Sequence, residues 1–183
     1  MEFTVLKTKV VVSPLFFAVL TAFFIADRNG IAIPVVLFSF LHECGHFLAL
    51  LCVKTRPKEI TVSAFGIEMQ LQENMSTGEK IFVLMAGFLV NYVLSAVCFL
   101  CGKTVFGFIN LFLGIFTSLP IGATDGGTVL KTVLACFCAE KTYKIISAIF
   151  SALLAVVLSA IAVYSKNYYL FIAVIYIIIS IKK

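Results

Sequence analysis

Apolar runs of about 20 residues recur along almost the whole chain, separated by short polar breaks. A helix needs a run of that length to cross the hydrocarbon core of a bilayer. Hydrophobic residues make up 62% of the chain and charged residues only 13%, whereas soluble domains carry roughly 25% charged residues. A soluble core could not hide that much apolar surface. The sequence therefore predicts an all-α polytopic membrane protein, organised as a single membrane domain over residues 1–183.

Six apolar segments predict membrane-spanning helices: 10–26, 31–53, 81–101, 104–119, 145–164 and 168–181. The first segment follows two lysines, as in a signal peptide, but lacks a small-residue cleavage site, so we expect an uncleaved helix. With both termini in the cytoplasm, 11 of the 14 basic residues fall on the cytoplasmic side, in line with the positive-inside rule. The net charge of +5 is thus a topology signal. We expect a multi-pass protein of a bacterial cytoplasmic membrane that does not bind nucleic acid.

Two segments interrupt the helical pattern. Arg56 and Pro57 end the second helix, and two short β-prone stretches around Gly66 then predict a β-hairpin over about 60–72 at the membrane surface. Further along, Pro120 and three glycines predict a broken helix or loop over 120–127.

The second apolar run carries the sequence "HECGH". His42 and His46 lie four residues apart, a spacing that places both on one helix face and suits two nitrogen ligands of one zinc ion. Glu43 can reach a water held by such an ion, so HExxH is the metalloprotease pattern with glutamate as general base. His42 lies roughly 17 Å into the run at 1.5 Å per residue, near mid-membrane, where polar groups point to function. Mere hydrogen bonding to neighbouring helices would explain neither the spacing nor the clustering.

Two histidines and a water leave a tetrahedral zinc ion one protein ligand short. Most of the nine acidic residues lie in polar breaks or near a terminus. Asp125 is the best candidate, because there apolar chain leads into a Pro/Gly-broken stretch, which is tolerated at membrane depth where it lines a cavity. Taken alone, a simple Asp-Gly turn is at least as good an interpretation of that segment.

Three sequence blocks extend the pattern beyond the histidines. "LHECGH" at 41–46, "AGFLVN" at 86–91 and "LPIGATDGG" at 119–127 resemble, in order and spacing, the signature blocks of the site-2 protease family of intramembrane zinc metalloproteases. The resemblance covers about 10–135, the expected metalloprotease core, and leaves C-terminal helices over 145–183. The compact layout is most similar to the sporulation branch that processes a sigma-factor precursor. Members of that branch often add a regulatory nucleotide-binding domain, which we expect to be missing from this polypeptide.

The resemblance implies that His42, His46 and Asp125 hold one zinc ion and that Glu43 activates the attacking water. It therefore implies an intramembrane zinc endopeptidase, which hydrolyses peptide bonds in or near transmembrane or membrane-associated segments. Regulated proteolysis of a transcription-factor precursor is the corresponding biological expectation. The expected partners are a membrane-associated protein substrate and a regulatory membrane protein, with oligomerisation left open.

The resemblance also implies substrate-side roles. Asn91 is expected near the active site, helping to hold substrate or the developing oxyanion, and the hairpin at Phe65 and Gly66 is expected to pair with unwound substrate by β-augmentation. Without the family, Asn91 is read as an ordinary interhelical hydrogen bond and the hairpin as a surface loop. The chain departs from the family pattern at Phe88, usually proline, and at Thr117, usually asparagine.

Two other classes of function remain as alternatives. A membrane metal-ion transporter could use the His/Glu/Asp cluster as a transit site, although the repeated halves common in transporters are not visible in the sequence. A catalytically dead scaffold that binds a membrane partner is the other alternative, and the intact HExxH pattern argues against it.

Overall fold

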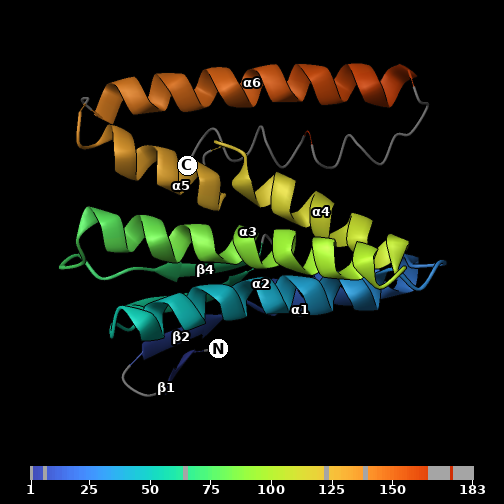
Figure 1. Ribbon diagram of the computed structural model, residues 1–183, viewed down its shortest axis with the longest axis horizontal. Coiled ribbons are helices and arrows are strands. Elements are labelled where there is room, and N and C mark those ends of the chain that lie inside the picture. The colour runs from blue at the N-terminus through green and yellow to red at the C-terminus, as the bar shows by residue number, and fades with distance from the viewer. Residues whose placement is uncertain are drawn as a thin grey trace. The chain divides into compact units, whose positions relative to one another are not determined.

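The structure is a computed structural model that describes residues 2–5, 8–63, 66–121, 124–137, 140–164 and 174. Its elements follow the order β1-β2-α1-α2-β3-β4-α3-α4-α5-α6 (Figure 1). The chain divides into two compact units, Met1–Gly114 and Ile115–Lys183. The single protease domain expected from the sequence stays a prediction, and the two units are described in turn.

Helices α2 (Ala32–Cys52) and α3 (Thr77–Leu100) form the centre of the first unit and lie side by side (Figure 1). Their backbones approach closely at Gly45, where a Cβ atom would lie 2.8 Å from Cγ2 of Val90 and 2.9 Å from the Ala86 carbonyl oxygen. Small residues permit such close packing between apolar helices. The buried cluster of the unit lies along the same pair of helices and comprises Ala49, Leu50, Met75 and Val83.

A mixed four-stranded sheet completes the first unit. Strands β3 (Glu59–Ser63) and β4 (Gly66–Gln70) pair in antiparallel register, which confirms the predicted hairpin. The N-terminal strands β1 (Glu2–Val5) and β2 (Thr8–Val12) form a second antiparallel pair, and β2 joins β3 in parallel. The chain is mostly helical with a small sheet, and the prediction missed only the strands β1 and β2.

The first predicted span also begins too early. Residues 10–12 are strand, because three consecutive β-branched valines pair with Ile60, Thr61 and Val62 of the hairpin. Helix α1 (Pro14–Ala26) starts only at a proline preceded by Ser13, whose hydroxyl accepts a hydrogen bond from the Leu15 amide. Hydropathy does not separate such a strand from the apolar helix that follows it.

The pairing of β2 with β3 places residues 8–12 and 59–63 together, at the two ends of the α1–α2 segment. The basic-residue pattern predicts the same, since it assigns both segments to one side of the membrane. At the opposite end, Asp27 accepts hydrogen bonds from the backbone amides of Asn29 (3.1 Å) and Ala32 (2.8 Å). The bond from Ala32 lowers the pKa of the Asp27 carboxyl below its ordinary value of 3.8. This carboxylate satisfies the start of α2, whose N-cap residue Ile31 makes no side-chain capping bond.

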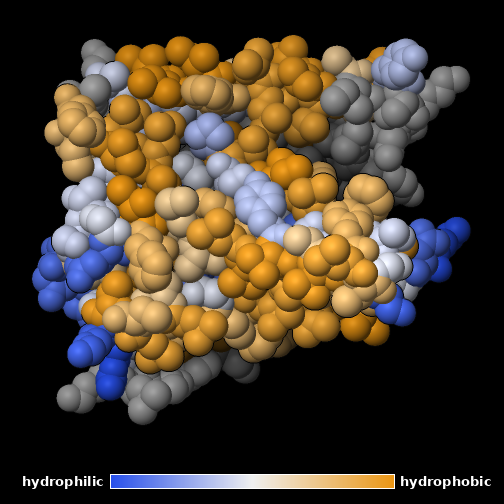
Figure 2. Space-filling model, in the orientation of Figure 1, coloured by the Kyte–Doolittle hydropathy of each residue, from blue (hydrophilic) through white to orange (hydrophobic). Residues whose placement is uncertain are grey.

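Three helices in the described part of the chain are long and apolar enough to cross a membrane: Ala32–Cys52, Thr77–Leu100 and Thr142–Tyr164. Two shorter apolar helices, α1 and α4 (Thr104–Ser118), match the first and fourth predicted spans in position. The sixth predicted span, 168–181, lies outside the described residues except for Val174. Hydrophobic residues cover most of the helical surface visible in Figure 2. Six membrane-spanning helices stay a prediction.

The second unit contains α5 (Asp125–Leu134) and α6 (Glu140–Tyr164). The Lys131 ammonium lies 5.8 Å from the centroid of the Tyr143 ring and so links the two helices by a cation–π contact. Helix α4 ends at Ser118 and α5 begins at Asp125. The described residues between them are not helical, which agrees with the first part of the predicted break over 120–127, although residues 122–123 lie outside the described part. Residues 125–127 instead form the first turn of α5.

Candidate metal centre

His46 has one ring nitrogen committed to the protein backbone. Its side chain is buried, and Nδ1 lies 2.8 Å from the Val83 carbonyl oxygen on α3. A carbonyl oxygen can only accept a hydrogen bond, so Nδ1 carries the proton and donates it. The Nε2 atom consequently carries no proton, which is the state a metal ligand requires.

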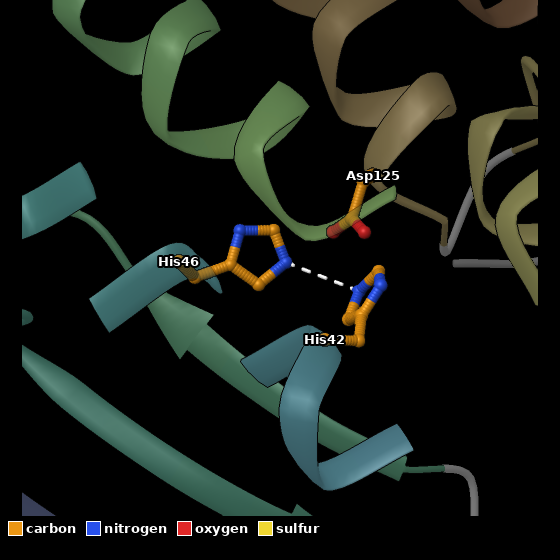
Figure 3. A group of neighbouring side chains, drawn as sticks. All are labelled: His42, His46 and Asp125. Carbon is orange, nitrogen blue, oxygen red and sulfur yellow. Dashed lines mark hydrogen bonds between the residues drawn. The ribbon is translucent and has the colours of Figure 1, made fainter. Parts of the chain in front are cut away.

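His42 is buried on the same face of α2, one turn earlier. Its Nε2 lies 3.2 Å from Nε2 of His46, and its Nδ1 lies 3.1 Å from Nδ2 of Asn91 (Figure 3 shows the two rings). An amide nitrogen can only donate, so Nδ1 of His42 accepts and Nε2 carries the proton. A directional chain of hydrogen bonds therefore runs from Asn91 through both imidazoles to the carbonyl of Val83.

The spacing of the two Nε2 atoms suits one zinc ion. Two nitrogens bound to a tetrahedral zinc at about 2.0–2.1 Å lie about 3.3 Å apart. The observed separation is 3.2 Å. Both rings already present these atoms to each other, so binding would require the proton to leave Nε2 of His42, with little movement of the rings.

Gly87 on α3 makes room for the histidine pair. A Cβ atom at this position would lie 2.6 Å from Cε1 of His46 and 2.7 Å from Cε1 of His42. Real Cβ atoms do not approach other atoms so closely, so the rings occupy the space that any other residue would fill. Gly87 belongs to the "AGFLVN" block at 86–91, but the sequence predicted no role for it. A glycine inside an apolar helix was the available signal, since glycine is unfavourable there without a packing reason.

Asp125 is the first residue of α5 and does not lie in a simple Asp-Gly turn. Thr124 caps the helix by accepting a hydrogen bond from the Gly127 amide at 3.2 Å. Gly126 packs against the end of α4, because a Cβ atom there would overlap the Ser118 carbonyl group and lie 2.7 Å from the Leu119 carbonyl oxygen. The "DGG" sequence is thus explained by a close backbone contact and a helix start.

His42, His46 and Asp125 each offer a ligand atom, and these atoms all lie within 4.8 Å of one another. Figure 3 draws these three side chains. They are the residues predicted from the sequence as metal ligands, and that assignment stays a prediction. Two imidazoles and one carboxylate form the kind of donor set that catalytic zinc sites use.

The remaining predicted residues lie around this group or outside the described part. Glu43 is half-buried and follows His42 on α2. Gly66 opens strand β4 with a φ of +125°, a conformation that favours glycine, whereas Phe65 lies outside the described residues. Phe88, which replaces the family's proline, packs edge-on against Tyr92 with 6.2 Å between ring centroids.

Comparisons with known proteins agree on the kind of fold. A Synechocystis protein named "Putative zinc metalloprotease" is 31% identical over 120 residues, which make up 57% of this chain and 32% of that protein. The chain thus spans about a third of the length of this curated relative. The solved structure of a site-2 protease from Methanocaldococcus jannaschii superimposes with a TM-score of 0.74 at 17% identity, covering 100% of this chain and 93% of that one. No protein-family model matches the chain. The chain has a site-2-protease-like fold, and its three long apolar helices are those of a membrane protein.

Proposed function

We propose that this chain is an intramembrane zinc endopeptidase that hydrolyses peptide bonds in or near membrane segments of its substrates. The observation that carries the proposal is the buried pair of His42 and His46 on a 21-residue apolar helix, with their Nε2 atoms 3.2 Å apart. Asp125 is the third residue of the group that could hold a metal ion. The site-2-protease-like fold and the similarity to a zinc metalloprotease support it.

The chemistry of the residues fits zinc. His46 presents an unprotonated Nε2, because Nδ1 donates its proton to the Val83 carbonyl oxygen. His42 would bind through Nε2 as well, and the Asp125 carboxylate would supply the third ligand and one negative charge. When bound, zinc polarises a substrate carbonyl and lowers the pKa of a water towards about 7.

Glu43 is proposed as the general base and acid. It follows His42 on α2 and is half-buried. The carboxylate would take a proton from the attacking water and later give it to the leaving amine nitrogen, which conserves protons over the cycle. The neighbouring helices exclude bulk water from both imidazoles, whose residues are each only 6% exposed.

The substrate is proposed to be a membrane-associated protein, with β4 as the strand that receives it. Strand β4 is an edge of the sheet in the order β1-β2-β3-β4, and an edge strand offers unpaired backbone groups to an extended peptide. A helical substrate would have to unwind to expose its scissile carbonyl. The narrower proposal is a sporulation-type protease that acts in regulated proteolysis, with a regulatory membrane protein as partner.

The test compares wild type with Glu43→Gln in native membranes, using mass spectrometry to find newly formed protein N-termini. We expect fragments cut in or beside apolar segments with wild type and none with Glu43→Gln, while both purified proteins hold one zinc ion per chain. Glu73→Gln serves as the matched control, because Glu73 is exposed and pairs with Lys58 at 3.3 Å on the loop before α3. Identical fragments from Glu43→Gln would refute the proposal, and chain-dependent zinc flux into vesicles without cleavage would establish a transporter instead.

A further inference from the structure

Asn91 of α3 contacts the histidine pair through a hydrogen bond to His42. Asn91 is 1% exposed, and its Nδ2 atom lies 3.1 Å from Nδ1 of His42. The other end of the amide, Oδ1, is buried without a hydrogen-bond partner among the described residues. A buried acceptor without a partner is unfavourable, so it calls for an explanation.

The hydrogen-bond chain described above belongs to the metal-free site. In it, Nε2 of His42 carries a proton and points at Nε2 of His46, 3.2 Å away. A zinc ion at this position requires the lone pair of Nε2, so the neutral ring must then carry its proton on Nδ1. Nδ1 changes from acceptor to donor, and the Nδ2 atom now facing it cannot accept.

The unpartnered Oδ1 atom supplies the missing acceptor. Rotation of the amide by about 180° about its terminal torsion exchanges Nδ2 and Oδ1 without moving the rest of the side chain. We propose that Asn91 positions His42 for the metal with both ends of its amide: Nδ2 donates to Nδ1 in the metal-free site, and Oδ1 accepts from Nδ1–H when Nε2 binds zinc. The inference rests on the proposed zinc site.

The surroundings hold Asn91 in place for this role. Gly114 of α4 approaches closely, because a Cβ atom there would lie 3.0 Å from the Tyr92 ring and 3.4 Å from Cβ of Asn91. The second histidine, His46, has a fixed acceptor, the Val83 carbonyl oxygen. The two histidines thus differ: a backbone carbonyl can serve only one tautomer of His46, whereas an amide can serve either tautomer of His42. Asn91 is a positioning residue in this scheme, since it acts through His42.

The first test measures zinc affinity by competition with a chelator. Asn91→Leu keeps the size of the side chain but removes both polar atoms, and we expect it to bind zinc 10–100-fold more weakly than wild type. Asn91→Asp keeps an acceptor and should retain affinity within a few-fold. The matched controls are Asn110→Leu and Asn110→Asp, because Asn110 is also a fully buried asparagine with an unpartnered Oδ1 among the described residues, but it donates to the Phe106 carbonyl.

The second test reads the tautomer of His42 from its ring ¹⁵N chemical shifts in the metal-free proteins. We expect the proton on Nε2 in wild type and on Nδ1 in Asn91→Asp, a shift that loss of packing alone would not produce. If Asn91→Leu does not fold, the His42 tautomer in Asn91→Asp alone tests the proposed role of Asn91. Equal zinc affinity of Asn91→Leu and wild type, or an unchanged His42 tautomer in Asn91→Asp, would overturn the inference and leave the proposed function intact. Failure of wild type to bind zinc at all would overturn both.

Discussion

Replacement of Gly87 by alanine adds one methyl group at the point where α3 faces both metal-binding histidines. The new Cβ atom would lie 2.6 Å from Cε1 of His46 and 2.7 Å from Cε1 of His42. The first contact is about 0.9 Å shorter than the 3.5 Å at which carbon contacts become favourable. Neither ring can simply turn away, because His46 is held by the Val83 carbonyl and His42 by Asn91.

The expected loss of zinc affinity follows from how little a zinc site tolerates changes in its metal–ligand distances. Metal–ligand distances vary by about 0.2 Å, so displacing even one ring by several tenths of an ångström disturbs the pair of Nε2 atoms. We expect zinc affinity to fall about 10–100-fold, or about 1.4–2.7 kcal/mol. Overpacking should also lower the free energy of unfolding by about 1–3 kcal/mol.

Gly78→Ala is the matched control on the same helix. An added Cβ at Gly78 meets nothing within 4 Å, so this change should leave zinc affinity unaltered and stabilise α3 by up to about 1 kcal/mol. The assay is a chelator-competition titration of both purified variants, combined with thermal unfolding. If Gly87→Ala binds zinc as tightly as Gly78→Ala does, the rings do not occupy the space over Gly87 and the described site geometry is wrong.

Two further predictions concern the ends of helices. Gly126→Ala should lower the free energy of unfolding by about 1–3 kcal/mol in thermal denaturation, because its Cβ would overlap the Ser118 carbonyl group; an unchanged melting temperature would contradict the close contact. Asp27→Asn should lose stability relative to wild type at neutral pH, since the Ala32 amide lowers the pKa of the Asp27 carboxyl in the folded chain. That advantage of wild type is present above the ordinary value of 3.8 and should vanish as the pH falls through the lower folded-state pKa. A difference in unfolding free energy that stays constant down to about pH 2 would refute the assignment.

The histidine pair and the hairpin were predictable because their signals are local. HExxH spacing depends only on helix geometry, and the hairpin follows from β-prone residues on both sides of a turn. The strand over residues 8–12 was missed, because a short run of valines beside an apolar helix has no distinguishing period. Its strand state depends on Ile60, Thr61 and Val62, which lie about 50 residues further along. A pattern read one segment at a time does not contain that pairing.

The roles of Val83 and Gly87 were unpredictable for a related reason, since they depend on how α3 is registered against α2. Moving α3 by one residue would shift it about 1.5 Å along its axis and turn it by about 100°. The Val83 carbonyl would then leave Nδ1 of His46, and a side chain would enter the space over the rings. Gly45 of α2 fixes this register from the other side, because only a residue without Cβ fits against the Ala86 backbone. The HExxH pattern alone does not set this register. Gly45 lets the two helices approach closely, so that the Val83 carbonyl oxygen reaches Nδ1 of His46. Gly87 leaves the space that both imidazole rings occupy.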